Sequence, residues 1–400
     1  METITFYLKQ HTPLIDFQHY QEDSTLRASA VKPQLDRFLI GLMGGSKTAS
    51  DNGWLAQTDN PNSTALNYRM TIVPTNERDS RMTSQLLNSY PNFFGNMRAN
   101  PNDNENYKRF TFYPDPLKVT LTFPSVDGPS LAEFILTEHR EALARFFFRT
   151  NFGTRASKGF GSYYINKEDF FYVSPSELNT DGYSFAIKSK DKPYNEIKGN
   201  HYYVLFRVIE LFYKALRGGI VEYGRNSYKF ESLAHRYCKD KLHAVCDKQG
   251  IKDVLFERLP TNRNEYCDIK DTMGFSTNEF WRHQGANVSK KIRGQGGDLP
   301  TRMQSPLLFK PFKANKAFTV YLVFKEKEVQ LDTFLSYHTV RASRNHSNKY
   351  VDLTLPRPFQ LQDFFDYVLG LSQYVEDQYE NHPYTAILTH VFNQLKNITD

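Results

Sequence analysis

Residues 130–165, SLAEFILTEHREALARFFFRTNFGTRASKGFGSYYI, decide the fold. Ser130, followed three residues later by Glu133, forms a capping box, which predicts the start of a helix. Six apolar residues then recur at helical spacing on one face: Leu131, Phe134, Ile135, Leu143, Phe146 and Phe147. The helix is expected to run into a glycine-rich loop, after which residues 163–165 predict a strand.

The residues before this segment predict three more strands and one more helix. Apolar and polar residues alternate over residues 4–8, 66–72 and 117–123, which is typical of half-buried strands. Apolar residues recur at helical spacing over 31–42. Residues 74–116, rich in Asn, Arg and Pro, predict an insertion loop. The order β-α-β-β-α-β over residues 1–175 predicts a ferredoxin-like unit.

The remaining residues, 176–400, predict a second unit. Tyr183, Phe185 and Ile187 alternate with polar residues as in a strand, and residues 204–216 follow as a helix that ends at Gly218-Gly219. Residues from about 220 to 300 are polar with mainly helical patterning and predict an insertion. The expected fold class is therefore α+β, with two ferredoxin-like (RRM-like, βαββαβ) units that carry helical and loop insertions.

Composition narrows the class of protein. The 400 residues are 40% hydrophobic with a net charge of +6, so the chain can bury a core and wholesale disorder is disfavoured. Three cysteines cannot form a disulfide framework, and the chain is expected to be cytoplasmic. A membrane helix needs about 18 uninterrupted apolar residues, and none is expected here. Because +6 is a small excess, the distribution of the cations matters more than their number.

The glycine-rich loop is the first candidate binding site. Its cations and glycines are Arg149, Gly153, Arg155, Lys158, Gly159 and Gly161. Glycines allow close approach to the backbone, so such a loop can hold a phosphodiester chain. The loop lacks the Gly-Lys-Ser/Thr end of a Walker motif, and it precedes a strand instead of following one, so no nucleotide cofactor is expected. A turn that only redirects the chain is the alternative.

Two further segments could contact phosphates. Arg27 and Lys32 flank the first turn of the first helix, where free amides favour an anion, although a solvated helix cap is equally compatible. Residues 282–302 contain a basic run that predicts a flexible loop, with Lys290, Lys291, Arg293 and Arg302 as candidate phosphate contacts. A solvated surface is the alternative for this run.

Four motifs give the chain a family resemblance. Residues 153–162, GTRASKGFGS, fit the form G-x-R-x-x-K/R-G-F/Y-G-S, and the chain thereby resembles the RAMP superfamily of CRISPR-associated proteins. Residues 12–14 (TPL), 26–32 (LRASAVK) and 302–308 (RMQSPLL) are similar, in that order, to motifs of the first subunit of the Cmr (type III-B) effector. The chain departs from that pattern at residues 15–18, IDFQ, and at Pro33, where family members usually have glycines.

The resemblance implies a non-catalytic RNA-binding subunit of a type III-B CRISPR ribonucleoprotein that acts in antiviral defence. It implies a place at one end of the complex beside other RAMP subunits, and contact with the 3′ part of the guide RNA or its duplex with target RNA. The residues expected at the RNA are Arg27, Lys32, Arg149, Gly153, Arg155, Lys158, Gly159, Phe160, Gly161, Lys290, Lys291, Arg293 and Arg302. The rings of Phe152, Phe160 and Tyr163 could stack on bases or lie in the core.

Two other functions remain open at this point. A metal-independent guide-processing ribonuclease would need a proton-transfer group, and His11, His19 and His139 are candidates by residue type. A scaffold subunit would use the glycine-rich loop to contact a neighbouring protein.

One group of residues has the residue types of a zinc site: His235, Cys238, His243 and Cys246. On one continuous helix the first and last of these would lie about 16 Å apart, so they could bind one ion only if the helix broke near residues 239–241. No metal is therefore expected.

Overall fold

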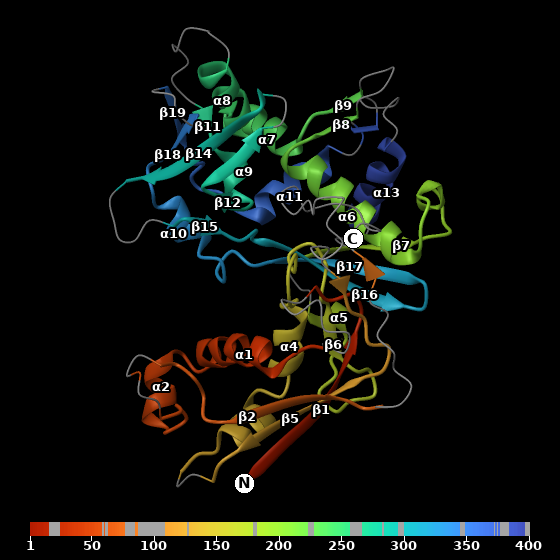
Figure 1. Cartoon of the computed structure of the whole chain (residues 1–400), viewed down its shortest axis with the longest axis vertical. Helices are drawn as coiled ribbons and strands as arrows, with labels where there is room; N and C mark the ends of the chain where they lie inside the picture. The colour runs from red at the N-terminus through yellow and green to blue at the C-terminus, as the bar shows by residue number, and fades with distance from the viewer. Residues whose placement is uncertain are drawn as a thin grey trace. The chain divides into compact units, whose positions relative to one another are not determined.

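The computed structural model describes residues 1–15, 25–57, 60, 63–76, 85–86, 109–125, 128–178, 182–222, 228–256, 266–281, 284–294, 300–344, 349–371, 373, 375–376 and 384–396. The chain is a mixed α+β protein that divides into two compact units (Figure 1). The first unit comprises residues 1–181, 200–206 and 309–321, and the second comprises 182–199, 207–308 and 322–400. The sequence predicts a division at 175/176, whereas the first compact unit also includes residues 176–181, 200–206 and 309–321.

An antiparallel sheet forms the centre of the first unit. Its strands are β1 (Glu2–Gln10), β2 (Arg69–Pro74), β5 (Leu117–Phe123) and β6 (Tyr163–Ile165), in the spatial order β2-β5-β1-β6. β1 pairs with β5 from Glu2↔Phe123 to Leu8↔Leu117 and with β6 from Leu8↔Ile165. Alternate residues of β1 are buried, as the sequence alternation predicts.

Helices α1 (Ala28–Leu42), α3 (Leu131–Glu133) and α4 (Ala142–Phe148) pack on this sheet. The other helical segments of the unit are α2 (Ser46–Asp51), the π-helical turn η2 (Phe134–Glu138) and α5 (Pro175–Leu178). In Figure 1, α1 lies beside α4, and the rings of Phe38 and Phe146 meet with centroids 5.7 Å apart. Ser130 caps α3 as predicted, since its hydroxyl accepts from the backbone N–H groups of Ala132 (3.2 Å) and Glu133 (3.4 Å).

The single helix predicted after Ser130 is interrupted. The chain passes from α3 through the π-helical turn and then through a turn before α4 begins at Ala142. Residues 137–141, Thr-Glu-His-Arg-Glu, contain no apolar side chain, so this part of the segment has nothing to bury against the sheet. The predicted apolar face nevertheless forms, because Leu131, Ile135 and Phe147 are all buried.

The predicted insertion at 74–116 lies mostly outside the described residues. Within it the structure describes a two-stranded ladder of β3 (Gln85–Leu86) and β4 (Arg109–Phe110).

A six-stranded sheet forms much of the second unit. Its strands are β10 (Val245–Cys246), β11 (Tyr266–Cys267), β13 (Asn278–Trp281), β14 (Ala286–Arg293), β18 (Thr339–Arg344) and β19 (Tyr350–Thr354), in the order β10-β11-β19-β18-β14-β13. Helix α8 (Asp247–Leu255) packs on one face, against β18 and β19 (Figure 1). Inward-pointing residues on this face include Val288, Val340 and Leu353.

Further elements complete the second unit. The helices are α7 (Leu233–Lys241), α9 (Ile269–Thr272), α10 (Leu331–Leu335), α11 (Leu361–Gly370), α13 (Thr385–Lys396) and the short η3 (Tyr194–Glu196). The strands are β7 (Tyr183–Lys188), β8 (Ile220–Glu222), β9 (Tyr228–Phe230), β12 (Phe275–Ser276) and β15 (Arg302–Met303). Helix α6 (His201–Arg217) and strands β16 (Leu307–Ala314) and β17 (Ala317–Phe324) contain residues of both units.

The stretch from 220 to 300 differs from the mainly helical insertion that its pattern predicts. Helices α7, α8 and α9 are present, but β13 and β14 are strands of the large sheet. Ala286, Val288 and Ile292 alternate on the buried face of β14. This alternation with a period of two is the pattern of a strand, but the charged Lys290 and Lys291 between Val288 and Ile292 interrupt it in the sequence.

Among the described residues, no helix combines the length and the apolar character that a membrane span requires.

Candidate functional site

The glycine-rich loop of residues 151–162 is closed on itself. Asn151 and Ser162 form a β-bridge, and the Phe152 N–H donates to the Gly161 carbonyl (3.0 Å). Gly153 has φ +77° and Gly161 has φ +63°, a region that costs a residue with a Cβ about 1–2 kcal/mol. A Cβ on Gly153 would lie 2.5 Å from the Ile15 carbonyl oxygen, and one on Gly161 would overlap the Phe152 carbonyl oxygen. The loop therefore needs both glycines for its own packing.

The segment after β1 holds the loop from one side. The Thr12 hydroxyl donates to the Gly159 carbonyl (2.6 Å) and accepts from the Ser162 N–H (2.9 Å). Beside it, the Gly161 N–H donates to the Pro13 carbonyl (2.8 Å). The threonine-proline motif and the glycine-rich motif thus form one assembly, in which Thr12 is fully buried. The residue pattern alone gave Thr12 no role; only its place in the family motif marked it.

Strand β16 holds the loop from another side. The Phe309 N–H donates to the Ser157 carbonyl (3.1 Å), and the Ser162 hydroxyl donates to the Pro311 carbonyl (2.8 Å). The buried Lys310 ammonium donates to the carbonyls of Thr150 (2.9 Å) and Tyr163 (2.8 Å). All of these residues belong to the first unit. Sequence reasoning missed Lys310, although a lysine within the apolar run 307–312 is an unusual sign of an internal role.

The charged residues of the loop differ in exposure. Arg155 is partly exposed and has φ +61°, so it lies at a sharp turn of the loop. Arg149, which follows α4, is also partly exposed, and Gly153 is exposed. Lys158 is only 8% exposed, with its ammonium 6.0 Å from the Phe309 ring centroid. Of the candidate binding residues in and beside the loop, Arg149, Gly153 and Arg155 are therefore accessible to a ligand.

The three aromatic residues considered for base stacking lie in the core. Phe160 is fully buried and stacks on Phe206, with centroids 3.8 Å apart and ring planes 4° apart. Phe152 and Tyr163 are also buried. The structure therefore assigns these rings to packing, and Phe160 is left out of the interface proposed below.

The first turn of α1 contributes cations in the same unit. Lys32 donates to the Asp36 carboxylate (2.7 Å) and to the Leu66 carbonyl (2.8 Å), and its ammonium lies 4.2 Å from the Tyr68 ring centroid. Burial, together with the nearby Asp36 carboxylate, raises the pKa of Tyr68. These contacts engage Lys32 internally, whereas Arg27 at the helix start is half-buried.

The basic residues of β14 in the second unit point to opposite faces of the strand. Lys290 is buried, and its ammonium bonds to Asp271 (2.7 Å) and Glu279 (3.1 Å). Burial opposes the charge, but Asp271, Asp268 and Glu279 together raise the Lys290 pKa well above its ordinary value. Lys291 and Arg293 are exposed on the other face, as is Arg302 in β15. Where the structure describes the expected flexible loop, residues 286–293 form a strand instead, and Lys290 is unavailable to a ligand.

Three of the four residues considered for a zinc site have partners within the fold: His235, Cys238 and Cys246. His235 lies 3.2 Å from Glu231, and the Cys238 thiol donates to the Ala244 carbonyl (3.4 Å). Helix α7 ends at Lys241, so the helix break required for a common ion does occur. Even so, no group of His, Cys, Asp or Glu in the described part of the chain is arranged to hold a metal ion.

Of the three histidines considered for proton transfer, His19 lies outside the described residues. His11 is buried, and its Nδ1 accepts from the Lys313 N–H (2.9 Å). Burial, followed by the charge of Lys310, lowers the His11 pKa to about 3. His139 packs on Phe134, with centroids 4.3 Å apart.

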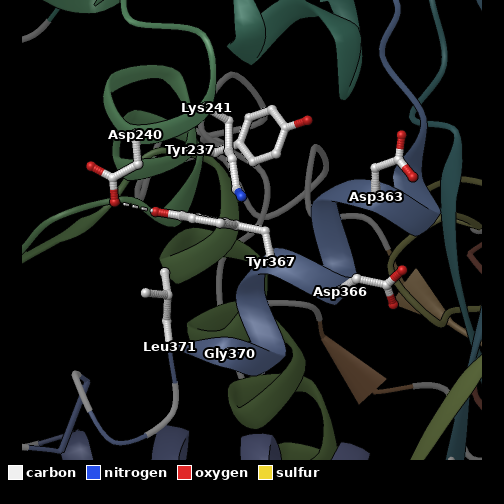
Figure 2. A pocket seen from close by; sticks show the side chains of 8 residues that line it. All are labelled: Tyr237, Asp240, Lys241, Asp363, Asp366, Tyr367, Gly370 and Leu371. Carbon is white, nitrogen blue, oxygen red and sulfur yellow. Dashed lines mark hydrogen bonds between the residues drawn. The ribbon is translucent and has the colours of Figure 1, made fainter.

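A pocket of about 730 Å³ lies between α7 and α11 in the second unit (Figure 2). Figure 2 shows the Tyr367 hydroxyl directed at Asp240 (2.7 Å) and the carboxylates of Asp363 and Asp366 on the other side of α11. Burial alone would raise the Asp240 pKa, but hydrogen bonds from Tyr367 and Arg236 lower it on balance. Three carboxylates against the cations of Lys241 and Arg236 leave a net negative charge, which disfavours phosphates, so this pocket is unsuited to RNA.

Comparison with known proteins agrees with the motifs assembled around the loop. Residues 1–220 match the family model of the Cmr1 N-terminal domain, and residues 229–397 match that of the Cmr1 C-terminal domain. The crystal structure of Cmr1 from Pyrococcus furiosus in its apo form aligns over 92% of this chain and 97% of that chain, with 11% sequence identity and a TM-score of 0.39. No curated protein matches the chain.

These family matches define a RAMP-like subunit of the Cmr (type III-B) CRISPR complex. The chain belongs to the Cmr1 family.

Proposed function

We propose that the chain is a non-catalytic RNA-binding subunit that engages the 3′ part of the guide RNA, or its duplex with target RNA, at one end of the complex. One observation carries the RNA-binding part of this proposal. Residues 12–15 and 309–311 brace the glycine-rich loop through buried hydrogen bonds, and the braced loop presents the partly exposed Arg155. A preorganised loop loses little entropy when it binds a phosphate.

The proposed RNA contacts are the cations and the loop backbone that remain accessible, taken for each unit separately. In the first unit these are Arg27, Arg149, Gly153 and Arg155, and in the second unit Lys291, Arg293 and Arg302. The other residues expected at the RNA act within the fold: Lys32, Lys158, Gly159, Phe160, Gly161 and Lys290.

Each unit is proposed to have a ferredoxin-like fold. The strand order β2-β5-β1-β6, with α1 after the first strand and α4 before the last, supports a ferredoxin-like first unit. For the second unit, β7 followed by α6 repeats the opening order of strand and helix. Its six-stranded sheet is then an addition to that plan.

Charge reversal at Arg155 tests the proposal. Arg155→Glu should weaken binding of a labelled single-stranded RNA, or of its duplex, at least about fivefold at low salt, because one charge-assisted phosphate contact becomes repulsive. For a single strand, the slope of log affinity against log salt should fall by about 0.7. Fluorescence anisotropy at several salt concentrations measures both quantities.

Lys167→Glu is the matched control, since Lys167 is exposed in the same unit and the charge change is identical. Equal affinities for Arg155→Glu and Lys167→Glu would count against the proposal. Incubation with labelled repeat RNA without metal should yield no cut product. Cleavage would instead support the guide-processing ribonuclease.

A further inference from the structure

The six-stranded sheet of the second unit has a second face, opposite the one that α8 covers. We call it the outer face, and it is formed by alternate residues of β13, β14, β18 and β19. Cross-strand pairing places Lys291 opposite Arg341, and Arg341 opposite Asp352. Phe280 pairs with Asn287 of β14, and Tyr350 pairs with Ser343 of β18. Both partners are on the outer face, so Phe280 and Tyr350 lie on it as well.

Charge on the outer face is positive. Lys291 and Arg341 are like charges directly opposite each other, an arrangement that costs stability. Asp352 compensates Arg341 through two hydrogen bonds of 2.6 Å. Lys291 and Arg293 are exposed, and neither forms an ion pair with any residue that the structure describes. Three cations therefore face one carboxylate, and two of the cations are open to a ligand.

Aromatic rings are exposed on the same face. Phe280 is 57% and Tyr350 is 52% exposed, whereas most of the large aromatic side chains described are buried or half-buried. The Arg341 guanidinium lies 3.8 Å from the Tyr350 ring centroid, where Asp352 holds it. Aromatic rings and guanidinium planes are the groups on which unpaired bases stack. The Arg341–Tyr350 pair is thus a stacking platform that is already assembled.

We propose that the outer face binds an unpaired segment of RNA, with bases stacked on the Arg341–Tyr350 platform and on Phe280 and with phosphates at Lys291 and Arg293. This inference rests on the proposed function, because RNA is the ligand in both. It adds a contact that selects single strands, since a base held within a duplex offers no free face. The excess of cations matches the negative charge of RNA phosphates, and lysine, as at position 291, is depleted at protein–protein interfaces.

The test uses the full chain with a fluorescein-labelled oligouridylate of ten residues and with a duplex of similar length. Tyr350→Leu should weaken binding of the single strand about five- to tenfold and leave binding of the duplex within about twofold. Lys291→Gln should lower the salt slope for the single strand by about 0.7. Phe170→Leu is the matched control, because Phe170 is 61% exposed and carries Arg140 at 3.9 Å from its ring, yet lies in the first unit.

The outcomes separate the two proposals. If Tyr350→Leu and Lys291→Gln bind the oligouridylate as wild type does while Arg155→Glu binds weakly, the outer face does not bind RNA, and the proposed function stands. If wild type binds neither RNA, both proposals fail. An equal loss for Tyr350→Leu and Phe170→Leu would overturn the outer-face site. The outer-face site would also be overturned if Tyr350→Leu and Lys291→Gln no longer bound a neighbouring protein subunit while their RNA affinity stayed unchanged. Thermal unfolding of each variant verifies that it is folded.

Discussion

At the scale of single residues, neighbouring lysines of β14 have opposite environments. Lys290 is buried between Asp271 and Glu279, and Lys291 points to solvent. A strand turns successive side chains to opposite faces, so one residue of sequence separates an internal ion pair from a surface charge.

Replacement of each lysine by methionine should separate these two roles. Lys290→Met removes one partner of a buried ion pair and leaves the buried Asp271 with only the more distant Arg217 (3.9 Å), so the free energy of unfolding should fall by about 3–5 kcal/mol. Lys291→Met should change it by less than about 0.5 kcal/mol. Urea unfolding measures both values. A Lys290→Met variant as stable as Lys291→Met would show that the buried pair contributes little.

At the scale of elements, the glycine-rich loop combines a functional motif with a packing requirement. Gly161 has φ +63° and no room for a Cβ beside the Phe152 carbonyl, whereas Gly44, at φ +84°, has nothing within 4 Å of its Cβ position. Both positions carry the cost of a left-handed backbone, and only Gly161 adds an overlap.

Alanine at each glycine should therefore give different losses. Gly44→Ala should lower the free energy of unfolding by about 1–2 kcal/mol, the cost of a Cβ in this backbone region. Gly161→Ala should lose at least about 2 kcal/mol more, because the overlap with the Phe152 carbonyl forces apart the two ends of the loop. Chemical denaturation of both variants gives the comparison. Similar losses would mean that the loop relaxes around the added methyl group.

Sequence periodicity predicted the elements that have one apolar face, and it was wrong where charge interrupted that face. The strands of the first sheet, α1 and the Ser130 cap follow from alternation, helical spacing and capping chemistry. The π-helical turn did not follow, because residues 137–141 interrupt the apolar face of the predicted helix. Strand β14 did not follow either, because Lys290 occupies a buried position that a pattern of apolar residues cannot mark. Likewise, the family motif located the loop, but the burial of Lys158 and Phe160 depends on residues 206 and 309, which are distant in sequence.

At the scale of the whole molecule, contacts between distant segments give stability a dependence on pH. His11 accepts a hydrogen bond from Lys313, which is 302 residues later in the chain. The folded protein protonates His11 only near pH 3, whereas an unfolded chain does so near 6.5. Between these values the unfolded state binds more protons, so the free energy of unfolding falls as the pH is lowered.

Removal of this histidine should flatten the pH dependence. Asparagine can accept the Lys313 N–H and has no proton to gain, so His11→Asn should lose about 3 kcal/mol less than wild type between pH 6.5 and pH 4. Urea unfolding at four or five pH values provides the two curves. Parallel curves would show that other groups dominate the acid side.

The discontinuous make-up of the first unit has a consequence for how the protein is made. Residues 309–321 supply the partners of Asn151 and Ser162, so a ribosome must synthesise most of the chain before those groups are satisfied. A nascent chain that ends near residue 220 would leave them without partners from β16, and such a fragment should be a poor substitute for the intact polypeptide.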